Sequence, residues 1–254
     1  MNLSATQSDA AYHVADVAGW TLLEFSAVDS TNFVAAKLAA WHAVRADTQT
    51  AGRGRFQRTW VSDAGGLWLS AVVPIGVDRD RWSALPLVAG LAVIQSLQGL
   101  GLASARLRWP NDIMVNERKL AGLLVDTFTP QLAVIGIGVN LTNHPDAHDA
   151  ALKETCTRLA DLVPQPPSLA TLTHAILASL KSALGVLTNE GFGPLRPRLN
   201  ELWGGSRRVT IDLDGVGRCG WFSGIDDRGR LLLQDDTLGL SAFEPHQVRL
   251  LREL

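Results

Sequence analysis

The sequence is poor in cysteine and has no segment that marks export or membrane insertion. Only two of its 254 residues are cysteines, Cys156 and Cys219, and their wide separation disfavours both a disulfide framework and a cysteine-based metal site. Residues 1–10 contain no basic region followed by an apolar run, and no apolar run reaches the ~18 residues that a membrane span needs. We therefore expect a cytoplasmic protein that does not bind membranes.

The familiar phosphate-binding loops are also missing. No Walker-type sequence occurs, and the glycine pairs at 52 and 54 and at 136 and 138 lack the third glycine of a dinucleotide-binding fingerprint. The formal net charge of -2 differs from the basic excess of a general nucleic-acid binder, so we expect no nucleic-acid partner. The content of 46% hydrophobic and 19% charged residues predicts a globular protein with a substantial core.

The most informative stretch is the arginine loop, residues 50–60. Arg53, Arg55 and Arg58 place three permanent charges within a few residues, and glycines at 52 and 54 let the backbone approach a ligand closely. This composition is typical of a loop that binds an anion. A solvated turn or an RNA-contacting segment has the same composition, so these alternatives stay open for the loop taken alone.

The hydrophobic pattern predicts an α+β fold with a mixed or largely antiparallel sheet and helices packed on one face. Residues 1 to about 12 are polar, and we expect them to be frayed. Strands are expected over residues 20–28, 42–46, 67–73, 105–109, 112–115, 119–128 and 131–140. Helices are expected over residues 33–41, from Asp78 and Asp80 to about 97, over 168–187 and over 194–203.

Beyond Gly204 and Gly205 the pattern changes to short strands separated by turns. These strands are expected over residues 208–213, 216–225, 230–234 and 240–244, and they predict a small SH3-like barrel. The chain is thus divided into domains at residues 1–204 and 205–254.

Three positions have both a structural and a functional interpretation. Ser30 or Asp29 is a natural helix N-cap, which we favour, although the same polar groups could hydrogen-bond a ligand. Lys119 is either a solvated strand end or a buried cation that needs an anionic partner. The glycines at 136 and 138 weaken a strand unless a ligand or another backbone must come close.

Four segments, in this order, resemble the biotin protein ligases. They are residues 29–32, residues 49–60, residues 108–112 with 119–122, and residues 135–140. The resemblance covers roughly residues 20–254. It implies a class II aminoacyl-tRNA synthetase-like catalytic domain and a C-terminal SH3-like barrel. It also implies a ligase that forms biotinyl-5'-AMP from biotin and ATP with Mg²⁺, and then transfers biotin to a lysine of the biotin carboxyl carrier protein of acetyl-CoA carboxylase.

The resemblance also implies roles for individual residues. Biotin is expected to contact Ser30, Thr31, Asn32, Gln49, Arg53, Gly54, Arg55, Lys119, Gly122 and Gly138. The nucleotide is expected to contact Arg55, Arg58, Trp60, Asn111 and Asn140. The expected catalytic residues are Arg53, Arg55, Asp112 and Lys119, and Mg²⁺ bound with ATP is assigned to Asn111 and Asp112. The loop is expected to act as a mobile lid, with Trp60 as its apolar cover.

Two departures from the family pattern qualify this interpretation. Gln57 stands where many relatives have glycine, which predicts a stiffer loop. About 19 residues precede the first expected strand at Trp20, so we expect a short form without the N-terminal DNA-binding domain of some relatives. The chain is expected to be a monomer or a weak homodimer. A lipoate ligase or octanoyltransferase of similar architecture, and an RNA or protein adaptor, remain as alternatives.

Overall fold

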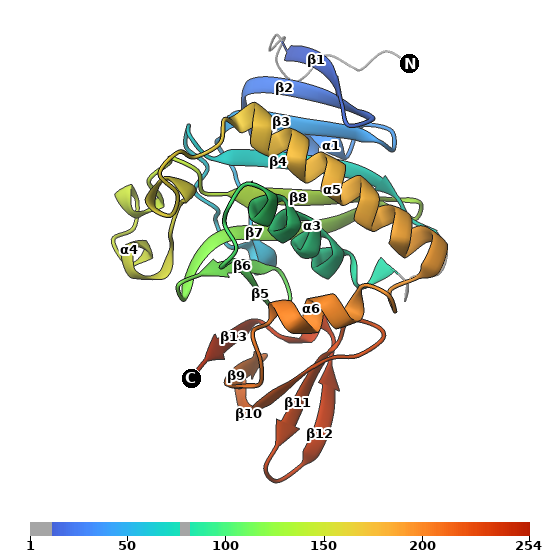
Figure 1. Cartoon of the computed structure of the whole chain (residues 1–254), viewed down its shortest axis with the longest axis vertical. Helices are drawn as coiled ribbons and strands as arrows, with labels where there is room; N and C mark the ends of the chain where they lie inside the picture. The colour runs from blue at the N-terminus through green and yellow to red at the C-terminus, as the bar shows by residue number, and fades with distance from the viewer. Residues whose placement is uncertain (1–11, 77–81) are drawn as a thin grey trace.

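The computed structural model describes residues 12–76 and 82–254. The expected frayed end before residue 12, and the helix start expected at Asp78 and Asp80, fall almost entirely outside these residues. The described chain contains two sheets (Figure 1). An eight-stranded sheet has the strand order β1-β2-β3-β4-β8-β7-β6-β5, and a five-stranded sheet has the order β12-β11-β10-β9-β13. The α+β architecture predicted from the sequence is confirmed.

The large sheet is mixed, because β2 and β3 run parallel whereas its other neighbouring strands run antiparallel. Its strands are β1 (Tyr12–Val17), β2 (Trp20–Val28), β3 (His42–Gln49), β4 (Leu67–Pro74), β5 (Arg106–Arg108), β6 (Asp112–Val115), β7 (Arg118–Thr129) and β8 (Leu132–Val139). The C-terminal sheet consists of β9 (Arg207–Leu213), β10 (Val216–Ile225), β11 (Leu231–Asp235), β12 (Gly239–Phe243) and β13 (Leu250–Glu253).

Two long helices, α3 (Leu85–Gly99) and α5 (Leu169–Glu190), cover one face of the large sheet (Figure 1). Successive side chains of a strand point to opposite faces, so each strand contributes to two environments. Ala43, Ala71 and Ile135 belong to the main core beneath these helices. Val44, Val72 and Val134 form a separate small core with the short helix α1 (Thr31–Ala35). In the part of the chain that the structure describes, no long helix covers the remainder of this second face (Figure 1).

Helix α5 begins where its sequence predicts. The hydroxyl of Ser168 accepts a hydrogen bond from the backbone N–H of Thr171 at 3.1 Å, and Gly191 follows the helix with φ 85°. By length and composition alone this helix is able to cross a membrane. Its leucines are instead buried in the main core, as in the core helix of a globular domain.

Several elements differ from the sequence prediction. Strand β1 was not predicted, because it is an edge strand whose side chains are mostly exposed and carry little hydrophobic signal. Strand β13 was not predicted either. Helix α1 ends at Ala35 and not at Trp41, which has φ 66°. Helix α6 (Arg196–Leu202) lies within the helix predicted over residues 194–203, whereas the short helices η1 (Arg55–Gln57), η2 (Pro145–Ala147), α4 (Leu152–Thr155), η3 (Leu159–Asp161) and η4 (Pro245–Gln247) were not predicted.

The expected domain boundary at residues 204 and 205 falls between α6 and β9. A cluster of four charges joins the two parts. Arg106 binds Glu253 at 2.5 Å and Glu117 at 2.5 Å, and Arg207 lies 3.2 Å from Glu117 and 3.3 Å from Glu253. Close by, the indole N–H of Trp109 donates to the backbone carbonyl of Gly229 at 3.0 Å. The C-terminal sheet is therefore fixed to the large sheet by directed polar contacts.

We expect Glu253→Gln to lower the free energy of unfolding by about 2 kcal/mol. Removing one partner of a buried ion pair costs about 3–5 kcal/mol, and here Arg106 keeps Glu117 as a second partner. Urea denaturation measures the change. The matched control is Glu201→Gln, which breaks an exposed pair with Arg198 and should change stability by less than about 0.5 kcal/mol. Equal effects of the two substitutions would contradict a structural role for the cluster.

Candidate active site

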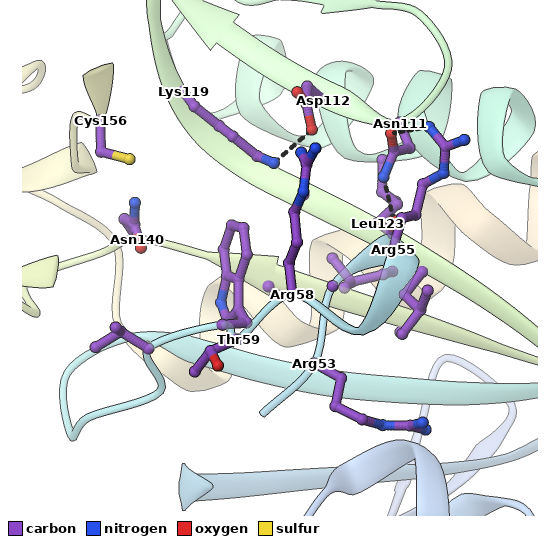
Figure 2. Close-up of a pocket in the computed structure, with 18 of the residues that line it drawn as sticks. Arg53, Arg55, Arg58, Thr59, Asn111, Asp112, Lys119, Leu123, Asn140 and Cys156 are labelled. Carbon is purple, nitrogen blue, oxygen red and sulfur yellow. Dashed lines mark hydrogen bonds and ion pairs between the residues drawn. The ribbon is translucent and has the colours of Figure 1, made fainter. Parts of the chain in front are cut away.

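A cavity of about 520 Å³ opens on the second face of the large sheet. Its walls are the arginine loop, the start of α1, the segment from Asn140 to Cys156, and residues 248–252 of the C-terminal sheet. The site is thus assembled from parts of the chain that are distant in sequence. Figure 2 shows the side chains around this cavity, with Lys119 and Asp112 on one side and Cys156 and Asn140 on another.

The cavity concentrates positive charge. Its cationic lining residues are Arg53, Arg55, Arg58, Arg108, Lys119, Arg249 and Arg252, and its acidic ones are Asp112, Glu117 and Glu154. This leaves an excess of four positive charges in a protein whose formal net charge is -2. Such a local excess attracts an anionic ligand through its field.

Glycines form the floor of the cavity on β7 and β8. A Cβ atom added at Gly138 would lie 2.8 Å from the indole nitrogen of Trp60, and one at Gly122 would lie 2.9 Å from Cζ3 of the same ring. A Cβ atom added at Gly136 would lie 2.5 Å from Oδ1 of Asn32. These glycines therefore make room for Trp60 and Asn32 on the sheet. The indole lies against this floor, with Nζ of Lys119 4.9 Å from its ring centre.

Neutral polar groups gather at one end of the cavity, where α1 begins. The side-chain oxygen of Gln49 accepts from the backbone N–H of Thr31 at 2.8 Å and from its hydroxyl at 3.0 Å. The hydroxyl of Ser70 lies 2.7 Å from that of Thr31 and 2.6 Å from Oδ1 of Asn32. Ser30 occupies the N-cap position without a side-chain capping hydrogen bond, so its hydroxyl does not play the capping role favoured from the sequence.

Lys119, Asp112 and Arg108 form an ion-pair group at the other end (Figure 2). Oδ1 of Asp112 lies 2.5 Å from Nζ of Lys119, and Oδ2 lies 2.7 Å from the guanidinium of Arg108. Burial raises the pKa of the Asp112 carboxyl, but the attraction of Lys119 and Arg108 outweighs it and lowers the pKa below its ordinary value. Asp112 therefore stays ionised, and Lys119 has the anionic partner that its position requires.

The arginine loop folds as a small hairpin. The N–H of Gly54 donates to the carbonyl of Arg58 at 2.7 Å, and the N–H of Trp60 donates to the carbonyl of Gly52 at 2.9 Å. Phe56 and Gln57 at the tip have φ 54° and 59°. This left-handed conformation favours glycine, which is the residue expected at position 57 in many relatives. Gln57 therefore places strain at the tip of the loop.

The three arginines of the loop point to two different places. Figure 2 shows Arg55 and Arg58 extending to the side of Lys119 and Asp112, whereas Arg53 extends away from them. Arg55 donates to the carbonyls of Pro245 and Val248, the latter at 3.0 Å, and burial lowers its pKa even though Asp112 opposes this shift. Arg58 reaches the carbonyl of Arg249 at 3.4 Å. The loop is thus held against residues 245–249, which connect β12 and β13.

Two asparagines expected to face the nucleotide are already hydrogen-bonded within the protein. Asn140 donates to the carbonyl of Thr157 at 3.1 Å and accepts from Asn143 at 3.2 Å. Asn111 donates to the carbonyl of Leu123 at 2.6 Å and accepts from Arg55 at 3.5 Å. Both line the cavity, and Asn140 also fixes the start of the segment that covers it.

The assignment of Mg²⁺ to Asn111 and Asp112 stays a prediction, and the oxygens it needs already have partners in the structure. Both carboxylate oxygens of Asp112 contact cations, and the amide oxygen of Asn111 accepts from Arg55 at 3.5 Å. Within residues 12–76 and 82–254, no cluster of three or more His, Cys, Asp or Glu side chains could hold a metal ion. A metal bound by Asn111 and Asp112 would share these oxygens with Lys119, Arg108 and Arg55.

Sequence reasoning missed several residues of the site. Ser70 and Asp126 contact Asn32 from β4 and β7, and Arg108 and Cys156 line the cavity near Lys119. Strand alternation places residues 70 and 126 on the same face as the glycine floor, but nothing in their local sequence marks them. Burial raises the pKa of the Cys156 thiol, so this group is kept protonated.

We expect Asp112→Asn to flatten the pH dependence of stability on the acid side. The lowered pKa of Asp112 in the folded state contributes stability above its unfolded pKa of about 4, and this stability is lost as the pH falls through the folded value. The wild-type protein should therefore lose its advantage over the variant as the pH falls from about 5 to 3. Urea unfolding at several pH values measures the difference. Parallel curves for the two proteins would contradict the ion-pair assignment.

Comparisons with known proteins match this arrangement. Residues 27–140 match the Biotin/lipoate A/B protein ligase family. A biotin–acetyl-CoA-carboxylase ligase of Mycobacterium tuberculosis is 35% identical over 195 residues, which cover 74% of this chain and 71% of that protein. The corresponding ligase of Paracoccus denitrificans is 34% identical over 234 residues, which cover 81% of this chain and 91% of that protein.

The fold has a close structural counterpart as well. A biotin protein ligase from Aquifex aeolicus, solved with biotin and ATP, superposes with a TM-score of 0.81 at 24% sequence identity, over 92% of this chain and 99% of that one. These similarities agree with the order of the four motifs and with the cationic loop. The chain therefore belongs to the biotin/lipoate protein ligase family, among its biotin protein ligases.

Proposed function

We propose that the protein activates biotin as biotinyl-5'-AMP with ATP and transfers the biotinyl group to a lysine of the biotin carboxyl carrier protein of acetyl-CoA carboxylase. The observation that carries the proposal is the division of one cavity into a neutral polar end and a strongly cationic end. A bicyclic ring with a polar ureido group suits the first end, and a carboxylate beside a triphosphate suits the second. Relatives named as ligases of this reaction support the same function.

In the first step, an oxygen of the biotin carboxylate attacks the α-phosphorus of ATP. The bond from this phosphorus to the bridging oxygen breaks, and pyrophosphate leaves. Negative charge gathers on the phosphoryl oxygens and on the leaving group, so cations held in place before the reaction stabilise the transition state. In this proposal Lys119 binds the carboxylate and the α-phosphate, and Arg55 and Arg58 bind the phosphates; all three side chains line the same cavity.

Asp112 supports this step without exchanging a proton. Its lowered pKa makes it a poor base, and its contacts fix the ammonium group of Lys119 and the guanidinium of Arg108. Mg²⁺, when bound with the nucleotide, supplies further neutralisation of phosphate charge. Because the donor set of Asn111 and Asp112 is engaged, the metal is held chiefly by the phosphates in this proposal.

In the second step, the amine of the acceptor lysine attacks the acyl carbon of biotinyl-5'-AMP. The bond from this carbon to the phosphate oxygen breaks, AMP leaves, and the amine loses a proton. The mixed anhydride is sensitive to water, which explains the need for a loop that covers it. The hairpin of residues 52–60, held by Pro245, Val248 and Arg249, is the element suited to this cover.

The proposed location of the protein is the cytoplasm. Cys156 and Cys219 are free thiols, in keeping with a reducing cytoplasm. The protein is proposed to act as a monomer or a weak homodimer, with biotin, ATP and the carrier protein as its partners. The absence of nucleic-acid binding remains a prediction.

The deciding experiment is mass spectrometry of a biotin carboxyl carrier domain incubated with the protein, biotin and Mg-ATP. The wild-type protein should add one biotinyl group to the domain. Arg55→Ala and Lys119→Ala should each slow transfer about 100-fold or more, because each removes a cation from the site where charge develops. Both variants should still melt cooperatively. Full activity in both folded variants would contradict the site assignment.

Pyrophosphate exchange separates the proposal from the lipoate alternative. Biotin should promote exchange of labelled pyrophosphate into ATP, whereas lipoate should not. The neutral polar lining made by Thr31, Asn32 and Gln49 is the reason, because its amide and hydroxyl groups can hydrogen-bond a ureido ring, whereas a plain acyl chain cannot use them. Stronger exchange with lipoate than with biotin would reverse the assignment.

We expect Gly138→Ala to raise the KM for biotin at least about tenfold. The new methyl group would overlap the indole of Trp60, which must leave the cavity floor. The matched control is Gly185→Ala in α5, where an added Cβ meets no atom within 4 Å. This control should keep the wild-type KM and gain up to about 1 kcal/mol of stability. Steady-state kinetics of carrier biotinylation provide the measurement, and an unchanged KM in Gly138→Ala would contradict the packing argument.

A further inference from the structure

Asp126 is a partly buried residue, and none of the functional assignments above uses its carboxylate. It lies on β7, two residues beyond Leu124, and its side chain is 28% exposed. Asp126 does not line the cavity, but its two partners, Asn32 and Arg53, both do. A residue in this position acts on a ligand only through the residues that it holds.

The first partner fixes the orientation of an amide. Nδ2 of Asn32 donates to Oδ2 of Asp126 at 2.9 Å, and Oδ1 of Asn32 accepts from the hydroxyl of Ser70 at 2.6 Å. A carboxylate only accepts hydrogen bonds, so the NH₂ group of Asn32 must face Asp126 and its carbonyl oxygen must face Ser70. Asn32 is buried, with 3% of its surface exposed. Asp126 therefore determines which polar atoms α1 presents at the neutral end of the cavity.

The second partner belongs to the arginine loop. Nη2 of Arg53 lies 3.5 Å from the same Oδ2 atom, and its guanidinium lies 4.0 Å from the ring centre of Phe33. These contacts explain why Arg53 extends away from Arg55 and Arg58 (Figure 2). The group of Asn32, Phe33, Arg53 and Asp126, here called the Asp126 clamp, joins α1, β7 and the loop. Oδ2 of Asp126 thus contacts both Asn32, at the neutral end of the cavity, and Arg53 of the loop.

The two contacts of the clamp differ in strength. The hydrogen bond to Asn32 is short and largely shielded from water, whereas the ion pair to Arg53 is long and both of its side chains are more than a quarter exposed. Ion pairs of the second kind contribute little and break readily. The Asn32 contact is therefore suited to persist while the loop opens and closes.

We propose that Asp126 is a positioning residue that orients the amide of Asn32 for ring recognition and holds the arginine loop closed through Arg53. The expected effect on biotin binding rests on the proposed function. The expected effect on the loop depends only on the contacts of Asp126 and does not require any particular substrate.

Two substitutions separate the two roles. Asp126→Asn removes the charge that attracts Arg53 but keeps an oxygen that accepts from Asn32. Asp126→Ala removes both. Asp47→Asn is the matched control, because Asp47 also lies on a strand of the large sheet and pairs with an arginine, Arg45, at 3.8 Å, outside the cavity.

The first measurement is hydrogen exchange of the loop in the full-length protein without ligand. Amides of Gly54, Arg58 and Trp60 are hydrogen-bonded within the hairpin. They should exchange about two- to fivefold faster in both Asp126 variants than in the wild type and in Asp47→Asn, as expected for the loss of a partly exposed ion pair. Equal exchange in all four folded proteins would overturn the clamp, whatever reaction the protein performs.

The second measurement is the dependence of carrier biotinylation on biotin concentration. Asp126→Ala should raise the KM for biotin about tenfold with less than about a threefold change in kcat, and Asp126→Asn should restore most of the KM. A general structural defect would lower kcat and melting temperature in both variants instead. An unchanged KM in Asp126→Ala would overturn the proposal that Asp126 orients Asn32 for biotin binding. If the wild-type protein forms no biotinyl-5'-AMP at all, the proposed function fails, and hydrogen exchange still decides the clamp.

Discussion

Positive charge gathered in one cavity is the constraint on which the rest of the structure depends. Like charges within a Debye length of ~8–10 Å repel one another, and burial strengthens the effect. The protein balances this repulsion with only a few partners. Asp112 lies between Lys119 and Arg108, and backbone carbonyls of the C-terminal sheet accept from Arg55 and Arg58. The cations are thereby held in place without being fully neutralised, which leaves their field available to a phosphate.

The alternation of side chains along the strands explains how one sheet provides both a core and a site. On β8, Ile135 and Ile137 belong to the main core, while Gly136 and Gly138 face the cavity. On β7, Ala121 and Leu123 belong to that core, while Gly122 faces the cavity. Burial of apolar side chains on one face stabilises the sheet, so the other face can be emptied of bulk. The glycines of these strands are therefore a consequence of the close approach of Trp60 and Asn32 to one face of the sheet only.

Much of this arrangement could be predicted from the sequence, because several motifs are local. The arginine loop and the polar segment before α1 carry their chemistry within a few residues, and hydrophobic periodicity located most strands. Contacts made by a single residue from a distant strand were not predictable. Ser70 and Asp126 lie in ordinary strand sequences, and only the register of β4, β8 and β7 brings them to Asn32.

Other parts escaped prediction for different physical reasons. Strand β1 packs at an exposed edge and therefore carries little hydrophobic signal. The capping role expected for Ser30 follows from helix statistics, but its hydroxyl makes no capping bond. The role of residues 248–252 in the cavity wall depends on how the C-terminal sheet docks, which is set by the charge cluster around Arg106 and Glu253.

Arg55 and Arg58 are held by hydrogen bonds to the main-chain oxygens of Pro245, Val248 and Arg249. An acceptor of this kind is present whatever side chain the residue bears. Evolution is therefore free to replace these three residues as long as the path of the backbone is kept. An insertion or deletion within residues 245–249 would alter the spacing of these acceptors, so this segment should tolerate changes of identity far better than changes of length.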